Sequence, residues 1–372
     1  MNRIFRLVWN RQLSQYVVAC EHARGRSKSS IRSVAGQVYV SLGSLFLGVA
    51  AHAGSLSGSL PNALPVGAVV TAGSAQVSTS GSTMTVQENS QNAAINWQGF
   101  SIGTNASVNF AQPNSSAVIL NRVVGSEASV INGALTANGQ VYLLNSNGVL
   151  IGKSGKVDAQ GFIASSLDIL DADFMAGKRT FSGSSSASIL NLGTITAKEG
   201  GYAALLGNQV SNQGVISARL GTVALAAGNR VSLNFNGDSL IGVTIEQGAL
   251  NALVENKQAI YADGGQVILT AQGLDAVLAA SVNNTGLIQA QTIGQNQGHI
   301  YLLGDTNSGA VNIAGTLDVS APNGGNGGSI SSTGYTVHVS DGALLNASGV
   351  NGGGTIEVGG GLHGADPNLA PA

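Results

Sequence analysis

Charged and aromatic residues are scarce in this sequence, and both shortages narrow the folds it can adopt. Only 9% of its 372 residues are charged and 5% are aromatic, whereas Val, Ile, Thr and Ala are abundant. A disordered chain typically has high charge and few β-branched residues, so this composition argues against disorder. A helical globule would need more Glu, Lys and Arg. The composition therefore favours β-strands joined by tight turns.

Cysteine is nearly absent, because Cys20 is the only one. A single thiol cannot form an intramolecular disulfide, which excludes the disulfide-rich class of secreted domains. The histidines are scattered without the spacing of metal ligands. The sequence also contains no nucleophile elbow and no convincing pair of carboxylates. It therefore predicts no enzyme, no catalytic or metal-binding residues and no cofactor.

Charge is distributed unevenly along the chain. Residues 1–53 hold seven Lys or Arg and one acid, whereas the remainder holds nine basic and seventeen acidic residues. The body is mildly acidic, so nucleic acid is not predicted as a partner. Residues 1–53 form a basic region, an apolar run and Ala51-His-Ala53, whose small residues suit cleavage after Ala53. We predict a long signal peptide read by the Sec export machinery, since the run is short for a retained membrane anchor.

Short motifs recur at fixed spacing after residue 187. Asn191–Ala197 returns as Asn212–Ala218, an offset of 21 residues. Similar segments are Gly200–Gly207 with Gly221–Gly228, and Asn132–Ala137, Asn284–Ala290 and Gly315–Ala321. A repeat of this length, with strands joined by Gly or Asn turns, is typical of a parallel β-helix. We predict an all-β fold, a right-handed single-stranded parallel β-helix (a solenoid) from about Ala94, with a short N-terminal β cap.

Two segments interrupt the repeats. Asp168–Phe181 is polar, aromatic and non-repeating, which predicts an excursion from the stack. Ile245–Lys257 has apolar residues at helical spacing, which predicts a short helix beside the rod. Within the earlier block, Asn145–Gly148 separates two apolar runs, and its Asn and Gly residues indicate a sharp turn.

The block from Ala94 to Asp168 resembles the secretion domain of two-partner-secretion exoproteins, the filamentous-haemagglutinin-like family. The similar motifs are Ile95-Asn-Trp97, Phe100-Ser-Ile-Gly103, Val108-Asn-Phe110, Leu120-Asn-Arg-Val123, Ile131-Asn-Gly133, Asn145-Ser-Asn-Gly148 and Ala164-Ser-Ser-Leu-Asp168. The family usually has Pro where this chain has Ser146, and its Asn-Pro-Asn-Leu motif is only partly matched by Gln112–Ser115. The first residues, MNRIFRLVWN and ARGR, are similar to the extended signal region of the same exoproteins.

This resemblance implies a protein secreted through the periplasm and outer membrane of a Gram-negative cell. Its partner would be an outer-membrane β-barrel transporter with periplasmic domains. Candidate recognition residues are Phe100, Asn114, Asn145, Asn147 and Gly148, although Phe100 and Trp97 are alternatively core residues. Outside the cell, an adhesin that binds host or bacterial surfaces is the first expectation. Alternatives are the carrier of a C-terminal toxin and a haem-capturing exoprotein.

The resulting division places the signal peptide at 1–53, cap strands at 54–93, the secretion domain at 94–185 and β-helix repeats at 186–372. Members of the family are usually far longer, so this sequence is expected to be either truncated or an unusually short member.

The first prediction concerns processing. Because Ala51 and Ala53 occupy the −3 and −1 positions, the exported protein is expected to begin at Gly54. N-terminal sequencing of the exported protein checks this, and a mature terminus at Met1 or Arg32 would contradict it.

Overall fold

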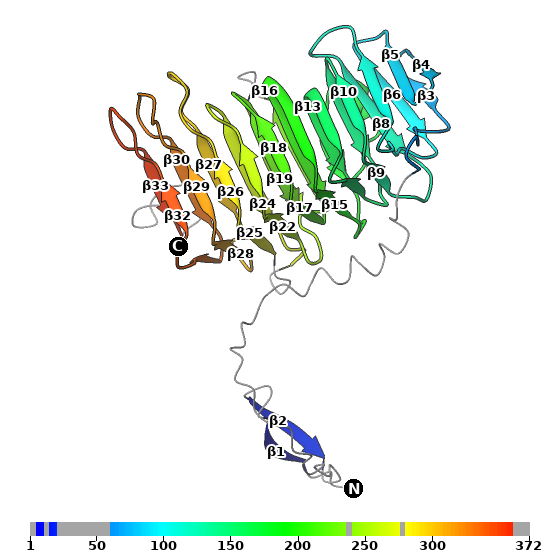
Figure 1. Ribbon diagram of the computed structural model, residues 1–372. Helices are drawn as coiled ribbons and strands as arrows, with labels where there is room; N and C mark the ends of the chain where they lie inside the picture. The colour runs from blue at the N-terminus through cyan, green and yellow to red at the C-terminus, as the bar shows by residue number, and fades with distance from the viewer. Residues whose placement is uncertain (1–4, 11–14, 21–59, 236–239, 276–279, 360–372) are drawn as a thin grey trace, which may run out of the picture. The chain divides into compact units, whose positions relative to one another are not determined.

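Stacked parallel strands form the body of the protein (Figure 1). The computed structural model describes residues 5–10, 15–20, 60–235, 240–275 and 280–359. The chain divides into two units, residues 1–48 and 49–372. In the first, β1 (Phe5–Asn10) and β2 (Gln15–Cys20) pair as an antiparallel hairpin. The predicted cleavage site at Ala53 lies outside the described residues. Within them, no helix has the length and apolar character needed to cross a bilayer.

Each coil of the second unit adds strands to two parallel sheets. Besides the cap strands, the larger sheet contains β5 (Thr83–Glu88), β6 (Asn92–Trp97), β7 (Ser107–Ala111), β8 (Val118–Val123), β10 (Ala134–Ala137), β11 (Gln140–Leu144), β13 (Lys156–Ser165), β16 (Thr194–Gly207), β18 (Val215–Ala218), β19 (Thr222–Ala227), β23 (Ala259–Tyr261), β24 (Gln266–Ala271), β26 (Leu287–Gln289), β27 (His299–Leu303), β29 (Thr316–Asp318), β30 (Ser329–Thr333), β32 (Leu344–Asn346) and β33 (Thr355–Val358). The smaller sheet contains β9 (Ser129–Ile131), β12 (Val149–Ile151), β15 (Ser188–Asn191), β17 (Gln209–Asn212), β22 (Leu253–Asn256), β25 (Ser281–Asn284), β28 (Ala310–Ile313) and β31 (Thr336–Val339). The predicted all-β, parallel β-helical fold is confirmed.

The repeat spacing in the sequence equals the offset between residues that pair in successive coils. β16 and β18 pair so that Ile195 faces Ile216, an offset of 21 residues. The later predicted copies also stack, because Ile288 faces Leu317. All four side chains are 0% exposed and point inward. Side chains alternate between the inner and outer face along each short strand, so every coil places apolar residues in one continuous core.

A row of buried amides runs along one corner of the rod. Its members are Asn191, Asn212, Asn256 and Asn284, each 0% exposed. Each side-chain nitrogen donates to the side-chain oxygen of the next member at 2.8 Å. An amide carries both a donor and an acceptor, so identical residues in successive coils satisfy one another.

Two antiparallel strands close the N-terminal end of the stack. β3 (Val69–Ala72) pairs with β6, and β4 (Ala75–Ser80) pairs with β5. These strands cover backbone groups that the first coil would otherwise expose. Parallel pairing begins with β5 on β7, before the predicted start at Ala94.

A second layer covers part of the outer surface of the larger sheet. It consists of α2 (Asp171–Met175), β14 (Thr180–Ser182), β20 (Arg230–Phe235) and β21 (Ile241–Gln247). The three strands form a separate antiparallel sheet. Phe174 and Phe181 pack with outward-facing Tyr142 in a second apolar cluster. The predicted excursion at Asp168–Phe181 is therefore confirmed.

The helix predicted over Ile245–Lys257 is wrong, because the chain forms the end of β21, a turn and β22 there. Asn251 has a φ of 57°, which no right-handed helix accommodates. Val254 instead stacks between Val210 and Val282 in the smaller sheet. Pairing with a coil on each side outweighs a weak local periodicity.

The buried amide row yields a stability prediction. Asn212→Ala is expected to lower the free energy of unfolding by about 2–4 kcal/mol, because it leaves the amides of Asn191 and Asn256 buried with unmet hydrogen bonds. The matched control is Asn312→Ala, whose half-buried amide donates to Asn283 at 2.8 Å. That change is expected to cost less than about 1 kcal/mol in denaturant unfolding. Equal losses in the two variants would contradict a special role for the row.

Candidate functional site

The short motifs of the block from Ala94 to Asp168 lie on neighbouring strands of the first coils. Trp97 Nε1 donates to Asn121 Oδ1 at 3.0 Å, and Asn121 Nδ2 donates to the Tyr142 carbonyl oxygen at 3.3 Å. Phe100 packs edge-on against Trp97, with ring centroids 5.4 Å apart, and is 1% exposed. Both rings belong to the core of the folded domain. Recognition of Phe100 stays a prediction that applies to the chain before it folds.

The turn at Asn145–Gly148 is fixed by its own amides, as predicted. Asn145 is 1% exposed, and its Nδ2 donates to the Glu127 carbonyl oxygen at 2.9 Å. Its Oδ1 accepts the backbone N–H of Asn147 at 2.9 Å. Gly148 has a φ of 98°, which a residue with a side chain rarely adopts. Asn147 donates to the Gly125 carbonyl oxygen at 3.0 Å but remains exposed. The buried Asn145 side chain thus holds the turn in place, and the Asn147 amide faces solvent.

The other candidate, Asn114, lies in an exposed loop between β7 and β8. Its Oδ1 accepts the backbone N–H of Ser116 at 3.0 Å, and its Nδ2 donates to Gln91 Oε1 at 2.9 Å. The loop is separate from the Asn145 turn in the contacts it makes. Its role in recognition stays a prediction.

A buried carboxyl at the end of β5 contacts the first residue of the same loop. Glu88 is 1% exposed, and Gln112 Nε2 donates to its Oε2 at 2.7 Å. The Glu88 Oε1 atom has no hydrogen-bond partner within the described part of the chain. Burial raises the pKa of Glu88 to about 7, and the hydrogen bond from Gln112 offsets only part of this effect.

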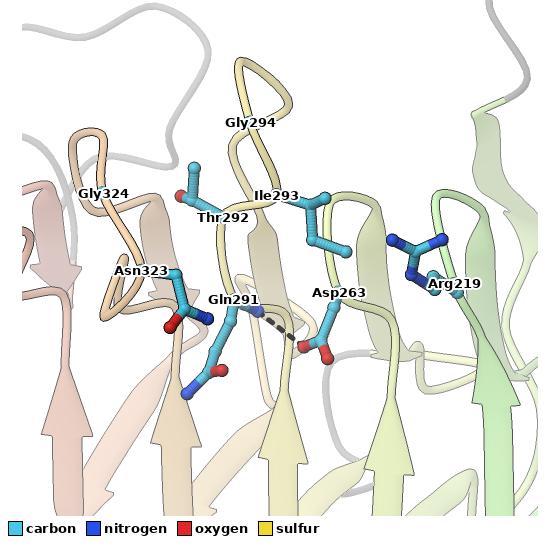
Figure 2. Close-up of a pocket in the computed structure, with 8 residues that line it drawn as sticks. All are labelled: Arg219, Asp263, Gln291, Thr292, Ile293, Gly294, Asn323 and Gly324. Atoms are coloured by element: carbon cyan, nitrogen blue, oxygen red, sulfur yellow. Dashed lines mark hydrogen bonds between the residues drawn. The ribbon is translucent and has the colours of Figure 1, made fainter.

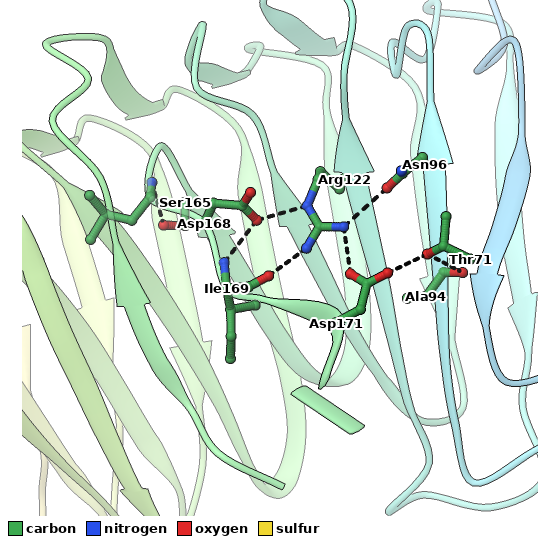
Figure 3. Close-up of polar contacts among 9 residues, drawn as sticks. Thr71, Ala94, Asn96, Arg122, Ser165, Asp168, Ile169 and Asp171 are labelled. Carbon is green, nitrogen blue, oxygen red and sulfur yellow. Dashed lines mark hydrogen bonds and ion pairs between the residues drawn. The ribbon is translucent and has the colours of Figure 1, made fainter. Parts of the chain in front are cut away.

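Arg122 joins segments that are far apart in the sequence (Figure 3). Its Nε lies 2.8 Å from Asp168 Oδ1 and its Nη1 lies 2.6 Å from Asp171 Oδ1. The same guanidinium donates to Asn96 Oδ1 at 3.1 Å and to the Ile169 carbonyl oxygen. Two of the quoted motifs, Leu120–Val123 and Ala164–Asp168, therefore meet through one ion pair.

This cluster also reaches the N-terminal cap. Thr71 on β3 donates its hydroxyl to Asp171 Oδ2 at 2.6 Å. Burial raises the pKa of Asp171, but the hydrogen bonds from Thr71 and Arg122 and the charge of Arg122 bring it below its usual value. Asp171 is thus held as a carboxylate between two separate parts of the chain.

No pattern in the sequence predicts this cluster, although two of the quoted motifs carry its Arg122 and Asp168. One feature of the sequence hinted at it: Arg122 and Asp168 are isolated charges within these motifs, in a chain with only 9% charged residues. Arg122 forms an ion pair with both Asp168 and Asp171. Asp173 pairs with Lys178 at 2.7 Å.

A cavity of about 390 Å³ lies on another edge of the rod (Figure 2). Short turns at residues 219–221 and 262–265 adjoin the longer loop 290–298, which carries Ile293 and Gly294 past them. Asp263 accepts the backbone N–H of Gln291 at 2.9 Å, and Arg219 pairs with Glu199 at 2.8 Å. The charged groups are already partnered within the protein, and the lining residues do not include a nucleophile beside a base.

Most of the chain matches known protein families. A family model described as the TPS secretion domain matches residues 62–332, and one described as the extended signal peptide of the type V secretion system matches residues 1–50. The solved HMW1 secretion domain from Haemophilus influenzae is similar, with a TM-score of 0.74 and 31% identity over 83% of this chain and 80% of that one.

Two heme/hemopexin-binding proteins are also similar. The one from Haemophilus influenzae strain Rd is 34% identical over 251 residues, or 65% of this chain and 27% of that protein. A second from Haemophilus influenzae is 35% identical over 245 residues, or 60% of this chain and 26% of that protein. The chain therefore spans about a quarter of the length of these curated relatives.

The raised pKa of Glu88 predicts a pH dependence. Between its usual value of 4.5 and about 7, the folded state binds more protons than the unfolded state, so stability falls as pH rises through this range. Glu88→Gln keeps a neutral side chain and is expected to be up to about 3 kcal/mol more stable than the unaltered protein at pH 8. At pH 4 the two should differ little. Thermal unfolding across this range is the measurement, and parallel curves for the two proteins would contradict the assignment.

Proposed function

The chain belongs to the family of two-partner-secretion exoproteins that carry a TPS secretion domain, and we propose that the transporter recognises its turn at Asn145–Gly148. An extended signal peptide and a TPS domain indicate a secreted protein, exported through the periplasm and the outer membrane. They also imply Sec export and a cognate outer-membrane transporter.

The contrast between Asn145 and Asn147 supports this proposal most directly. Asn145 is buried and satisfies the turn from inside, so its amide is unavailable to a partner. Asn147 is exposed, and its side-chain nitrogen donates to the Gly125 carbonyl oxygen and to Asn145 Oδ1. A turn fixed in advance presents its amide with little loss of conformational entropy on binding.

Asn114 and Phe100 are secondary candidates within the same proposal. Asn114 is exposed in a loop of the preceding coil, so it could contact a partner of the folded domain. Phe100 is buried and could contribute only when the segment is unfolded. A transporter that captures an extended chain would meet both residues, by strand addition with side chains giving specificity.

The proposed division of labour follows the residue ranges predicted from the sequence. Residues 1–53 direct export and are removed, β3 and β4 within residues 54–93 close the stack, residues 94–185 address the transporter, and residues 186–372 extend the rod. The TPS family match at 62–332 includes parts of the last three segments.

For the exported protein we propose a binding role rather than catalysis. Two relatives are named for binding heme and hemopexin, which favours ligand capture as an alternative to the adhesin and carries no support for a toxin. Purified protein can be tested for haem or hemopexin binding and, separately, for adhesion to host cells. Adhesion without haem or hemopexin binding would favour the adhesin, and the reverse result would favour ligand capture.

The recognition proposal predicts a separation of secretion from stability. Asn147→Ala removes an exposed hydrogen bond worth about 1 kcal/mol, which is small against a folding free energy of about 5–15 kcal/mol. We expect markedly reduced secretion with the cognate transporter and nearly unchanged thermal unfolding of the purified protein.

The matched control is Asn323→Ala, at an exposed Asn that also precedes a glycine with positive φ, Gly324. It should leave secretion unchanged. Ser146→Pro, which introduces the usual family residue, should leave secretion equal or improved. Normal secretion of Asn147→Ala would show that the turn has only a structural role.

A further inference from the structure

The Arg122 cluster connects three segments that lie far apart in the sequence. Arg122 pairs with Asp168 and Asp171, 46 and 49 residues away, and Asp171 bonds to Thr71, 100 residues away. These residues lie on β8, on the start of the excursion and on β3 of the cap. Figure 3 shows Asp171 between the guanidinium and the Thr71 hydroxyl.

The geometry depends on a guanidinium in particular. Arg122 uses its Nε, Nη1 and Nη2 atoms on Asp168, Asp171, Asn96 and the Ile169 carbonyl oxygen. A planar fork with fixed donors can hold several acceptors at once, whereas a lysine ammonium is a single charge on a flexible stem. Its side chain is only 16% exposed, compared with 53% for Arg219 in the ion pair with Glu199.

The cap strand has little support of its own. Its residues Val69, Val70 and Thr71 are exposed, and the strand pairs with β6 along one edge. It therefore buries little apolar surface to hold it in place. The hydrogen bond from Thr71 to Asp171 ties it to the excursion, and Arg122 fixes the position of Asp171.

From these contacts we propose that Arg122 is a positioning residue for export, which couples closure of the N-terminal cap to the arrival of residues 168–171. Before those residues emerge, Arg122 lacks its carboxylates, and the Thr71 hydroxyl has only the Ala94 carbonyl oxygen as an acceptor, at 3.4 Å. Once they dock, the cap, the first coils and the excursion close as one cooperative unit. A closed unit outside the membrane resists backward movement of the chain. The biological meaning rests on the export function above, but the coupling can be tested in the purified protein.

Hydrogen–deuterium exchange of the full exported protein tests the coupling. In the unaltered protein, amides of β3 and β14 should become accessible through one shared opening with the same free energy. In Arg122→Gln, the two segments should open independently, with β3 exchanging about ten-fold faster, since bonds to charged groups contribute more than neutral ones. Unchanged β3 exchange, or a shared opening that persists in the variant, would overturn the coupling.

Two further variants keep the result interpretable. Thr71→Val removes the 2.6 Å bond from the cap to Asp171, together with a longer 3.4 Å bond from the same hydroxyl to the Ala94 carbonyl oxygen on β6. It should speed exchange in β3 and leave β14 unchanged. Arg219→Gln removes an exposed ion pair elsewhere and should affect neither segment. A simple loss of global stability would instead speed exchange throughout, including β24 and β27, and would count against the proposal.

Secretion yield tests the role in export. Arg122→Gln should lower secreted yield with the cognate transporter, Arg122→Lys should restore it only in part, and Arg219→Gln should leave it normal. Normal export of Arg122→Gln would overturn that role. Because none of these variants alters Asn147, the outcome is distinguishable from failure of the turn as a recognition element.

Discussion

Backbone hydrogen bonds in the body of this protein run between coils rather than within them. Each coil depends on the strands above and below it, so the register of one coil fixes the next. This constraint explains the short strands and tight turns, and it makes the ends of the stack a special problem. The antiparallel strands β3 and β4 solve it at the N-terminal end, but β3 itself buries little apolar surface. The few polar contacts that hold this cap, such as the bond from Thr71 to Asp171, therefore matter for the stability of the N-terminal end.

Stacking also decides which polar groups the interior accepts. The row from Asn191 to Asn284 is favourable because each inner amide, Asn212 and Asn256, both donates to one neighbour and accepts from the other. A carboxylate only accepts, and Glu88 has a single donor, Gln112, on one of its two oxygens within the described residues. Its pKa rises to about 7 because burial favours the neutral acid. The same architecture thus makes one polar residue stabilising and another pH-sensitive.

The features with a proposed role in export lie where the chain departs from the regular strands. The Asn145 turn joins β11 to β12 and exposes Asn147, and the excursion at Asp168–Phe181 follows β13. A uniform rod offers similar surfaces along its length, so specificity has to come from such departures. Arg122 connects the excursion to the cap, which places the stability of the first coils and the export features in one network.

The sequence alone determined the parallel β-helix, the 21-residue register between β16 and β18, the turn at Asn145–Gly148 and the excursion after Asp168. These are local properties, because strand alternation, turn residues and repeat spacing are visible within a few tens of residues. Tertiary structure alone decided that Ile245–Lys257 is strand and turn, since Val254 gains partners in two neighbouring coils. It also decided that Phe100 is buried against Trp97, and that Arg122 meets Asp168, Asp171 and, through Asp171, Thr71. The Arg122 contacts join segments separated by 46 to 100 residues, and no local sequence pattern records which of these segments meet.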